Sequence, residues 1–163
     1  MTNKEMIKKL KDYAELAWAA YGYYDLMTNK SNDFYTKVEN DESKQDNNSF
    51  RKSILIQDIM DITYKNYEVY QYDTFLHREI KVGTLEGDFS PTQAKNFFEK
   101  YELLIHQPNT SNGFSATLFQ DKESKEFILA FRGTESFTRD MFITDFQLLL
   151  SSLTNQYQNE MRL

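Results

Sequence analysis

Four things are missing from this chain of 163 residues, and each absence excludes a class of protein. Without cysteine there is no disulfide and no thiol nucleophile, which fits a reducing compartment. A net charge of -6 argues against a nucleic-acid partner, whose phosphates call for a basic surface. No apolar run is long enough to span a bilayer. No calcium-loop spacing of acidic residues occurs, so we expect neither a metal nor a cofactor.

What the chain does contain suits one folded domain. Hydrophobic residues make up 40% and aromatic residues 15% of it, enough to build a core. Residues 3–27 predict an amphipathic helix, and its apolar positions recur at helical spacing: Met6, Leu10, Tyr13, Ala14, Ala17, Tyr21 and Tyr24. We expect this stripe to face the core or an interface, with a membrane-surface anchor as the alternative.

A secretory signal is the rival interpretation of the same N-terminal residues. Glu15 and Asp25 interrupt its apolar patch, and no small-residue cleavage site follows. The protein is therefore assigned to the cytoplasm by default, and export by signal-independent machinery is kept as an alternative.

The middle of the chain gives weaker patterns. Residues 28–49 are polar and predict a loop, and residues 50–106 predict a mixture of helix and loop. Within the latter, the pattern of residues 50–64 lies between helix and strand and favours helix. The tyrosines of residues 64–75 predict a packed shell around the first helix, or alternatively a lipid-accepting surface. Residues 81–89 contain two glycines and predict a loop.

Clearer signals begin at Ser90, which is placed to cap a helix with Pro91 at its first position and Gln93 at the capping-box spacing. Residues 103–106 then predict a strand. Two further strands are predicted at residues 114–119 and 127–131, joined by a short polar connection typical of a hairpin. Because residues 127–131 are almost wholly apolar, we expect that strand to be buried on both faces, as in a parallel sheet.

This last region resembles a known family. The residues GFSATLFQDKESKEFILAFRGTE, followed by Asp140 and TDFQLLL, resemble the α/β-hydrolase lipases, particularly class 3 lipases and related bacterial phospholipase-like proteins. The resemblance covers residues 107–150, about a quarter of the chain. It implies the fold class α/β: a partial α/β-hydrolase sheet of about three strands with N-terminal helices. Residues 1–163 would then form a single truncated lipase-like domain, and residues 107–153 its oxyanion-strand segment and following helix.

The resemblance gives two residues definite roles. In such lipases the residue after the Arg-Gly pair belongs to the oxyanion hole, which here is Thr134, while Gly133 is the backbone hinge. Preorganised donors stabilise the negative charge that develops on the former carbonyl oxygen of the ester. Gly133 suits the sharp turn because it lacks a Cβ. The alternative is a plain strand-ending turn with Thr134 as a helix cap, since residues 138–153 predict a helix with an apolar face.

The catalytic serine of this family stands in G-x-S-x-G, with its acid and histidine later in the chain. No such set follows Leu150, and the nearest string, Gly113 to Thr117, predicts a strand with Ser115 inside it. His77 and His106 both precede the oxyanion motif and are predicted as surface or edge residues. The resemblance therefore predicts an oxyanion segment without its nucleophile, and a chain that is inactive alone.

Two interpretations of function remain. The first is an N-terminal fragment of a lipase or phospholipase-like carboxylic-ester hydrolase, which acts on a lipid or ester only when a downstream segment completes it. The second is a non-catalytic, lipase-derived protein that binds a protein partner or a lipid. In both interpretations, the apolar strand from Phe127 to Phe131 favours self-association or pairing with a partner unless the N-terminal helices cover it.

Overall fold

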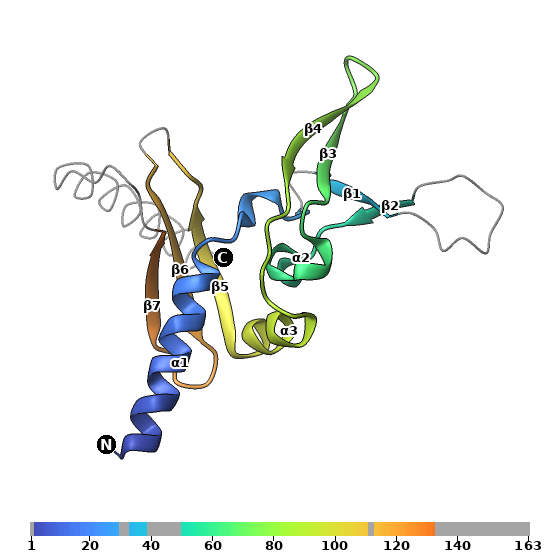
Figure 1. The fold of residues 1–163 in the computed structure, drawn as a ribbon. Coiled ribbons are helices and arrows are strands. Elements are labelled where there is room, and N and C mark those ends of the chain that lie inside the picture. Colours follow the sequence, from blue (N-terminus) through green and yellow to red (C-terminus); the bar gives the residue numbers. More distant parts are fainter. Residues whose placement is uncertain (1, 30–32, 39–49, 111–112, 133–163) are drawn as a thin grey trace, which may run out of the picture. The chain divides into compact units, whose positions relative to one another are not determined.

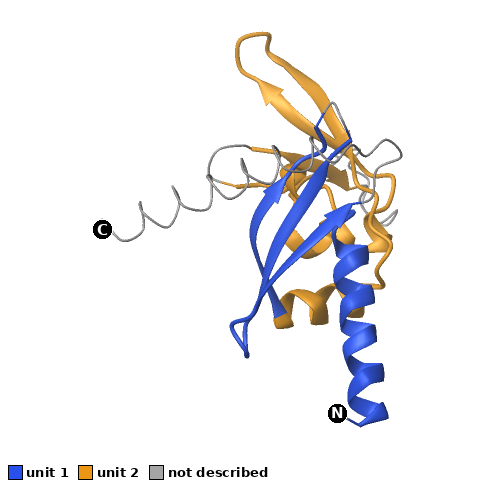
Figure 2. Ribbon diagram, turned by 90° about the vertical axis from the view of Figure 1, so that its left-hand side faces the viewer, with its two compact units in different colours: residues 1–21, 101–163 blue, residues 22–100 orange. Residues whose placement is uncertain are grey.

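The computed structural model describes residues 2–29, 33–38, 50–110 and 113–132, and these fall into two compact units. Residues 1–21 and 101–163 make up unit 1, and residues 22–100 make up unit 2 (Figure 2). Unit 1 is thus discontinuous in sequence, with the whole of unit 2 between its two parts.

Unit 1 combines helix α1 (Asn3–Ala19) with an antiparallel sheet of three strands in the order β5-β6-β7 (Figure 1). The strands are β5 (Tyr101–Gln107), β6 (Ser115–Asp121) and β7 (Phe127–Arg132). Thr2 and Glu5 form a capping box that starts α1, which contacts β7. In the sheet, Phe114 and Ala116 are buried and pack with Ile105 and Leu129.

Unit 2 contains a second antiparallel sheet, of four strands in the order β2-β1-β3-β4. Its strands are β1 (Tyr35–Val38), β2 (Phe50–Ser53), β3 (Glu68–Asp73) and β4 (Arg78–Thr84). The helices of this unit are α2 (Ile56–Met60), α3 (Pro91–Lys100) and two short 3-10 helices, Tyr24–Leu26 and Ile62–Tyr64. Its core is rich in aromatic rings: Phe97 meets Phe89 and Phe98 edge-on, with ring centroids 5.7 and 5.1 Å apart.

The helix predicted at Ser90 is confirmed as α3. The backbone N–H of Gln93 donates to Ser90 Oγ at 3.2 Å, and Pro91 is the first helical residue. Ala94, Phe97 and Phe98 form its buried face. The predicted strand at residues 103–106 lies within β5, and the two strands predicted downstream are β6 and β7.

The predicted fold class is wrong for the described residues. The strands form two antiparallel sheets, not a partial parallel α/β-hydrolase sheet. Chain connectivity is the physical reason, because parallel neighbours need a crossover of about a dozen residues or more, whereas β6 and β7 are joined by a tight turn. The strand buried along both faces is β6, where Ser115 to Phe119 are all buried. In β7, Phe127 is 56% exposed.

Several local predictions were also wrong. Residues 50–64 are not one helix but strand β2, the five-residue α2 and a 3-10 turn. The polar segment 28–49 contains β1, residues 81–84 belong to β4 rather than a loop, and the tyrosine-rich stretch forms β3. Helix α1 ends at Ala19, short of the predicted residue 27, and buries Leu16 and Ala19. Met6, Leu10 and Tyr13 belong to the stripe expected to face the core or an interface, and their exposure excludes the core.

Candidate functional site

The hairpin β6–β7 is the part of the structure that leads to the predicted oxyanion residues. Its turn is set by Asp121, whose Oδ1 accepts hydrogen bonds from the backbone N–H groups of Glu123 and Ser124, both at 2.9 Å. Lys125 closes the turn with a positive φ of 62°. The register then pairs Gln120 with Phe127 and runs without a bulge to the last pair. Local turn chemistry therefore aligns β7 against a buried neighbour.

The last residue of β7 is Arg132, which pairs with Ser115 across the hairpin. Its guanidinium lies over the ring of Tyr21, 5.3 Å from the ring centroid, just after the end of α1. Gly133 and Thr134 come next in the chain and lie outside the described residues. The structure thus describes β7, the strand that leads to these residues. It gives no position for Gly133, the predicted hinge, or for Thr134, the predicted hydrogen-bond donor.

Ser115 is not placed as a nucleophile. It is 2% exposed, lies at the start of β6, and its Oγ donates to the backbone carbonyl of Gln107 at 3.0 Å. The prediction that Ser115 is a strand residue is confirmed. A nucleophile elbow would hold the serine exposed on a sharp turn between a strand and a helix. Ser115 therefore has a structural role in joining β5 to β6.

The two histidines occupy different settings. His106 lies on β5, at the edge of the described sheet, and its Nδ1 is 2.9 Å from Thr117 Oγ1 on β6. That distance suits a nucleophile and its base, but Thr117 is fully buried in the central strand, so substrate has no access to it. His77 is exposed in the turn between β3 and β4, with a φ of 49°. Both were predicted as surface or edge residues, and both are.

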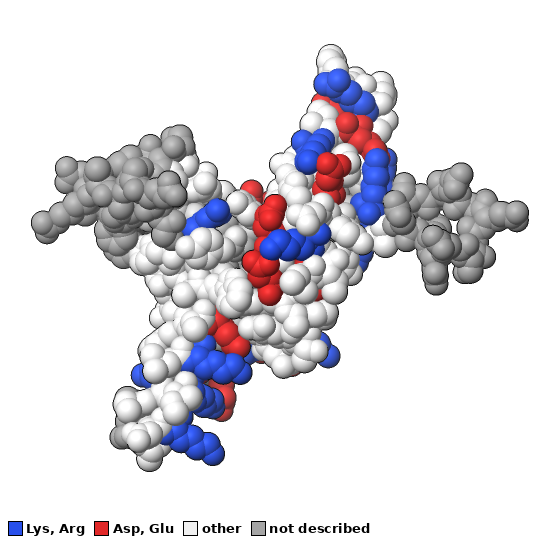
Figure 3. Space-filling view, in the orientation of Figure 1, with Lys and Arg blue, Asp and Glu red and all other residues white. Residues whose placement is uncertain are grey.

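One face of the four-stranded sheet in unit 2 carries a network of charged and aromatic side chains centred on Glu79. Its carboxylate accepts from the Tyr35 hydroxyl at 2.6 Å, from Lys37 Nζ at 2.5 Å and from Arg51 at 3.2 Å. Figure 3 shows basic and acidic side chains alternating over the β3–β4 hairpin. Lys37 and Arg51 are both paired with the same carboxylate, so the arrangement favours a structural network over an anion-binding surface.

The contacts of this network shift the pKa values of Glu79 and Tyr35. Hydrogen bonds from Lys37 and Tyr35 lower the pKa of Glu79 to about 2. Burial, followed by the hydrogen bond to the Glu79 carboxylate, raises the pKa of Tyr35 to about 12. Sequence analysis missed this network, although the i, i+2 spacing of Tyr35 and Lys37 was a signal for a strand face.

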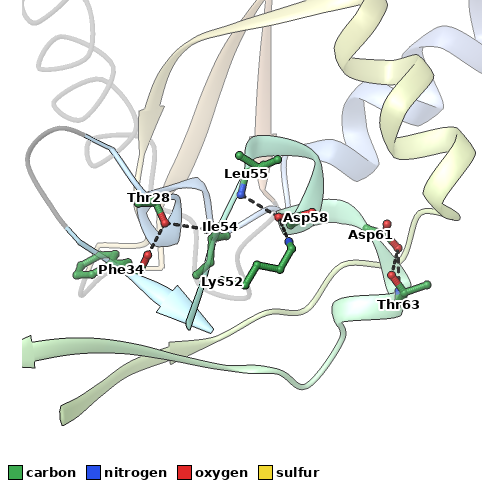
Figure 4. A network of polar contacts seen from close by, with 8 residues as sticks. All are labelled: Thr28, Phe34, Lys52, Ile54, Leu55, Asp58, Asp61 and Thr63. Carbon is green, nitrogen blue, oxygen red and sulfur yellow. Dashed lines mark hydrogen bonds and ion pairs between the residues drawn. The ribbon is translucent and has the colours of Figure 1, made fainter. Parts of the chain in front are cut away.

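A second polar network surrounds the start of α2 (Figure 4). Asp58 is buried, and its Oδ2 accepts from Lys52 Nζ at 2.5 Å and from the backbone N–H of Leu55 at 2.9 Å. The Lys52 ammonium also lies over the ring of Tyr64, 4.1 Å from the ring centroid. Nearby, Thr28 Oγ1 accepts from the Ile54 N–H at 2.7 Å and donates to the Phe34 carbonyl. These contacts join β2 and α2 to the segments that precede them.

Unit 2 also has a pocket of about 290 Å³, whose lining includes Tyr23, Asp25, Thr84 and Glu86. Two carboxylates there would favour a cation over an anion. Across the described residues, however, no three His, Asp or Glu side chains come together as a metal site needs.

Comparison with known proteins gave no relative: no protein-family model, curated protein or solved structure matches this chain. Within the part of the chain that the structure describes, no helix has the length and apolarity needed to cross a membrane. Functional inference accordingly rests on the residues themselves.

Proposed function

We propose that this chain supplies the oxyanion-hole strand of a lipase or phospholipase-like carboxylic-ester hydrolase. The observation that carries the proposal is the β6–β7 hairpin, whose second strand ends at Arg132, directly before Gly133 and Thr134. The polar connection from Asp121 to Lys125 predicted the hairpin, and the resemblance of this segment to class 3 lipases implies a donor at Thr134. The proposal concerns this strand and its donor, and does not require a parallel sheet.

Thr134 has the chemistry that the role needs. Its backbone N–H and its hydroxyl are both donors, and an ester carbonyl becomes an oxyanion when a nucleophile adds to its carbon. A donor held in place before reaction stabilises that charge by about 3 to 4 kcal/mol. Gly133 allows the backbone to turn out of the strand so that the donor approaches the substrate closely.

Ser115 does not fit the nucleophile, because it is buried and its hydroxyl donates a hydrogen bond to the carbonyl of Gln107. We propose that the serine, its acid and its histidine are encoded after the codon of Leu163. The chain by itself is then expected to release no product from p-nitrophenyl butyrate above the rate of the buffer.

The experiment begins with the DNA that follows the codon of Leu163, read in all three frames. A G-x-S-x-G after a strand-like run, with Asp and His beyond it, supports the proposal, and the joined protein is then assayed for esterase activity. In that protein Thr134→Val should lower kcat about 100- to 1,000-fold, and Thr134→Ser should retain most of the activity. Unrelated sequence after a stop codon would falsify the proposal, and full activity of Thr134→Val would exclude the Thr134 hydroxyl as a donor.

A second candidate is the non-catalytic interpretation, in which β7 binds a protein partner or another copy. It is favoured by the 56% exposure of Phe127 on β7, which pairs with β6 alone among the described strands. Sedimentation of the chain tests it, because Phe127→Lys should abolish any concentration-dependent association, while Glu123→Lys in the adjacent turn should not. A monomer at all concentrations excludes the self-association form of this candidate.

A further inference from the structure

Helix α1 carries an uncharged, mostly apolar arc on the side that faces away from its buried residues. Leu16 and Ala19, which are 3% and 0% exposed, mark the buried side. Ile7 and Leu10 each lie nine positions before one of them, which at about 100° per residue places them on the opposite side. They are 67% and 68% exposed. The helix therefore exposes large apolar side chains where a surface helix normally carries polar ones.

The limits of this arc follow from the helical wheel. It covers about 140° and holds no charged residue, and Asn3 in the first turn is its only strongly polar member. The other residues of the arc, which we call the outer face of α1, are Met6, Ile7, Leu10, Tyr13, Ala14, Ala17 and Trp18. The five large side chains among them are between 42% and 68% exposed. A contiguous apolar patch of this kind marks an interaction surface.

Lysines stand at both margins of the outer face. On the wheel, Lys11 and Lys4 follow Trp18 at one margin, and Lys9 follows Tyr13 at the other. The Lys9 ammonium lies 5.9 Å from the centroid of the Tyr13 ring, which places this charge beside the apolar surface. The acidic residues of the helix lie instead on the half that carries the buried residues: Glu5, Asp12 and Glu15. The outer face therefore suits an apolar partner with negative charge around it.

This pattern of charge selects among the possible occupants. A second copy of the chain would bring the lysines of one helix close to the lysines of the other, which is unfavourable. An anionic lipid surface complements them, because apolar side chains enter the boundary of the acyl chains while long lysine side chains extend to the head groups. Tyr13 and Trp18 also have the amphipathic rings that favour such an interface.

The net charge of the whole chain, -6, does not prevent this contact. At physiological ionic strength, charges separated by more than about 8 Å are largely screened, so the lysines nearest the lipid dominate the attraction. Lys11 pairs with Glu15 at 3.7 Å, but its side chain is 73% exposed, and such surface pairs are weak. The local charge at the margins therefore decides the sign of the interaction.

We propose that α1 binds an anionic membrane surface through its outer face, with its axis parallel to the bilayer and its marginal lysines on the lipid head groups. Apolar burial and electrostatic attraction then act together, as they do in interfacial amphipathic helices. The inference is independent of the proposed oxyanion role of Thr134, because binding to vesicles requires no ester hydrolysis. Either proposal can fail while the other holds.

Trp18 is the single tryptophan of the chain, so its fluorescence reports on the outer face of the unmodified protein. Vesicles of equal parts phosphatidylglycerol and phosphatidylcholine should shift its emission to shorter wavelength, and brominated acyl chains should quench it. Vesicles of phosphatidylcholine alone should bind at least about tenfold more weakly. Absence of binding, or equal binding to both kinds of vesicle, would overturn the proposal.

Two results without vesicles would also overturn it. If Trp18 of the vesicle-free monomer is already shielded from acrylamide, the chain itself covers the outer face. If shielding appears only as the protein dimerises in sedimentation, a second copy is the occupant.

A double variant tests the apolar part of the contact. Ile7→Gln with Leu10→Gln should weaken binding to the mixed vesicles about 100-fold, and glutamine preserves the helix. The matched control is Phe75→Gln with Leu76→Gln, which replaces two exposed apolar residues in the turn between β3 and β4. This control should bind as the unmodified protein does. Equal losses in the two double variants would contradict binding through α1.

A second pair of variants tests the charges. Lys4→Gln with Lys9→Gln removes one lysine from each margin and should weaken binding about 25-fold, since each lysine near an anionic surface contributes about fivefold. Lys65→Gln with Lys95→Gln changes the net charge by the same amount within unit 2 and should weaken binding less than about twofold. Equal losses would show that net charge, and not the margins of α1, controls the binding.

Discussion

The Tyr35 hydroxyl donates a hydrogen bond of 2.6 Å to Glu79 Oε1, joining β1 to β4 although β3 lies between them in the sheet. Tyr35 is 6% exposed, and its ring also stacks on Tyr70 with centroids 6.3 Å apart. The contact therefore spans three strands of the sheet and joins a buried tyrosine to an exposed glutamate.

Removing this hydroxyl should destabilise unit 2. Tyr35→Phe keeps the stacked ring and deletes one hydrogen bond to a charged acceptor, so we expect a loss of about 1 to 2 kcal/mol in urea unfolding. Tyr72→Phe is the matched control, because that residue is 39% exposed. A Tyr35→Phe protein as stable as the control would show that the hydrogen bond contributes nothing.

The lowered pKa of Glu79 predicts an acid-dependent contribution to stability. The folded-state pKa of about 2 lies below the ordinary value of 4.5, so the contribution is complete above 4.5 and is lost as pH falls toward 2. The stability difference between the unmodified protein and Glu79→Gln should therefore be constant above about pH 5 and shrink below pH 4.5.

Urea midpoints measured between pH 2.5 and 7 test this expectation. Glu99→Gln is the control: its exposed carboxylate pairs with Lys95, one turn away on α3, at 3.8 Å. A difference between Glu79→Gln and the unmodified protein that is as large at pH 2.5 as at pH 7 would contradict an electrostatic origin.

Replacing Asp58 should lower stability more than replacing an exposed carboxylate. Asp58→Ala leaves Lys52 without its carboxylate and the Leu55 N–H without its acceptor, so we expect a loss of about 2 to 3 kcal/mol. Asp88→Ala removes an ion pair of the same length, to Lys65, that is exposed on both sides, and should leave the urea midpoint nearly unchanged. Similar midpoints for the two variants would mean that burial does not strengthen the Asp58 contacts.

Replacing Thr36 should raise the stability of the protein rather than lower it. It is 1% exposed on β1, and its Oγ1 has no hydrogen-bond partner among the described residues. Thr36→Val keeps the β-branched shape and removes an unsatisfied hydroxyl, so we expect stability to rise by about 1 kcal/mol. Thr63→Val, which deletes a hydroxyl that donates to Asp61 at 2.8 Å, should lower it slightly. A destabilised Thr36→Val protein would indicate that the hydroxyl is satisfied.

The elements that sequence analysis predicted well are those specified by neighbouring residues. Ser90 and Pro91 determine the start of α3, and the polar residues from Asp121 to Lys125 determine the hairpin. Sheet membership depends on distant partners instead. Tyr35 pairs with Ser53 and with Tyr70, and nothing in the polar segment around it shows either partner.

Two predictions were limited by the same physical fact. The apolar run Phe127–Phe131 was taken as a strand buried on both faces, and the apolar stripe of α1 as facing the core or an interface, but a hydrophobic pattern does not identify what covers it. The candidate site divides in the same way. The strand leading to Gly133 was predictable from its turn, whereas the Glu79 and Asp58 networks required three-dimensional positions that the sequence does not reveal.

The division of unit 1 in the sequence has a consequence for biosynthesis. Helix α1 leaves the ribosome first, but its partner strand β7 is complete only when Arg132 has been added, roughly ten seconds later at ordinary elongation rates. The continuous segment Gly22–Lys100 is finished before that. Throughout this interval Leu16 and Ala19, which are buried in the finished unit, lack that cover, so the order of synthesis leaves the inner face of α1 open to chaperones for longer than that of any other helix of the described chain.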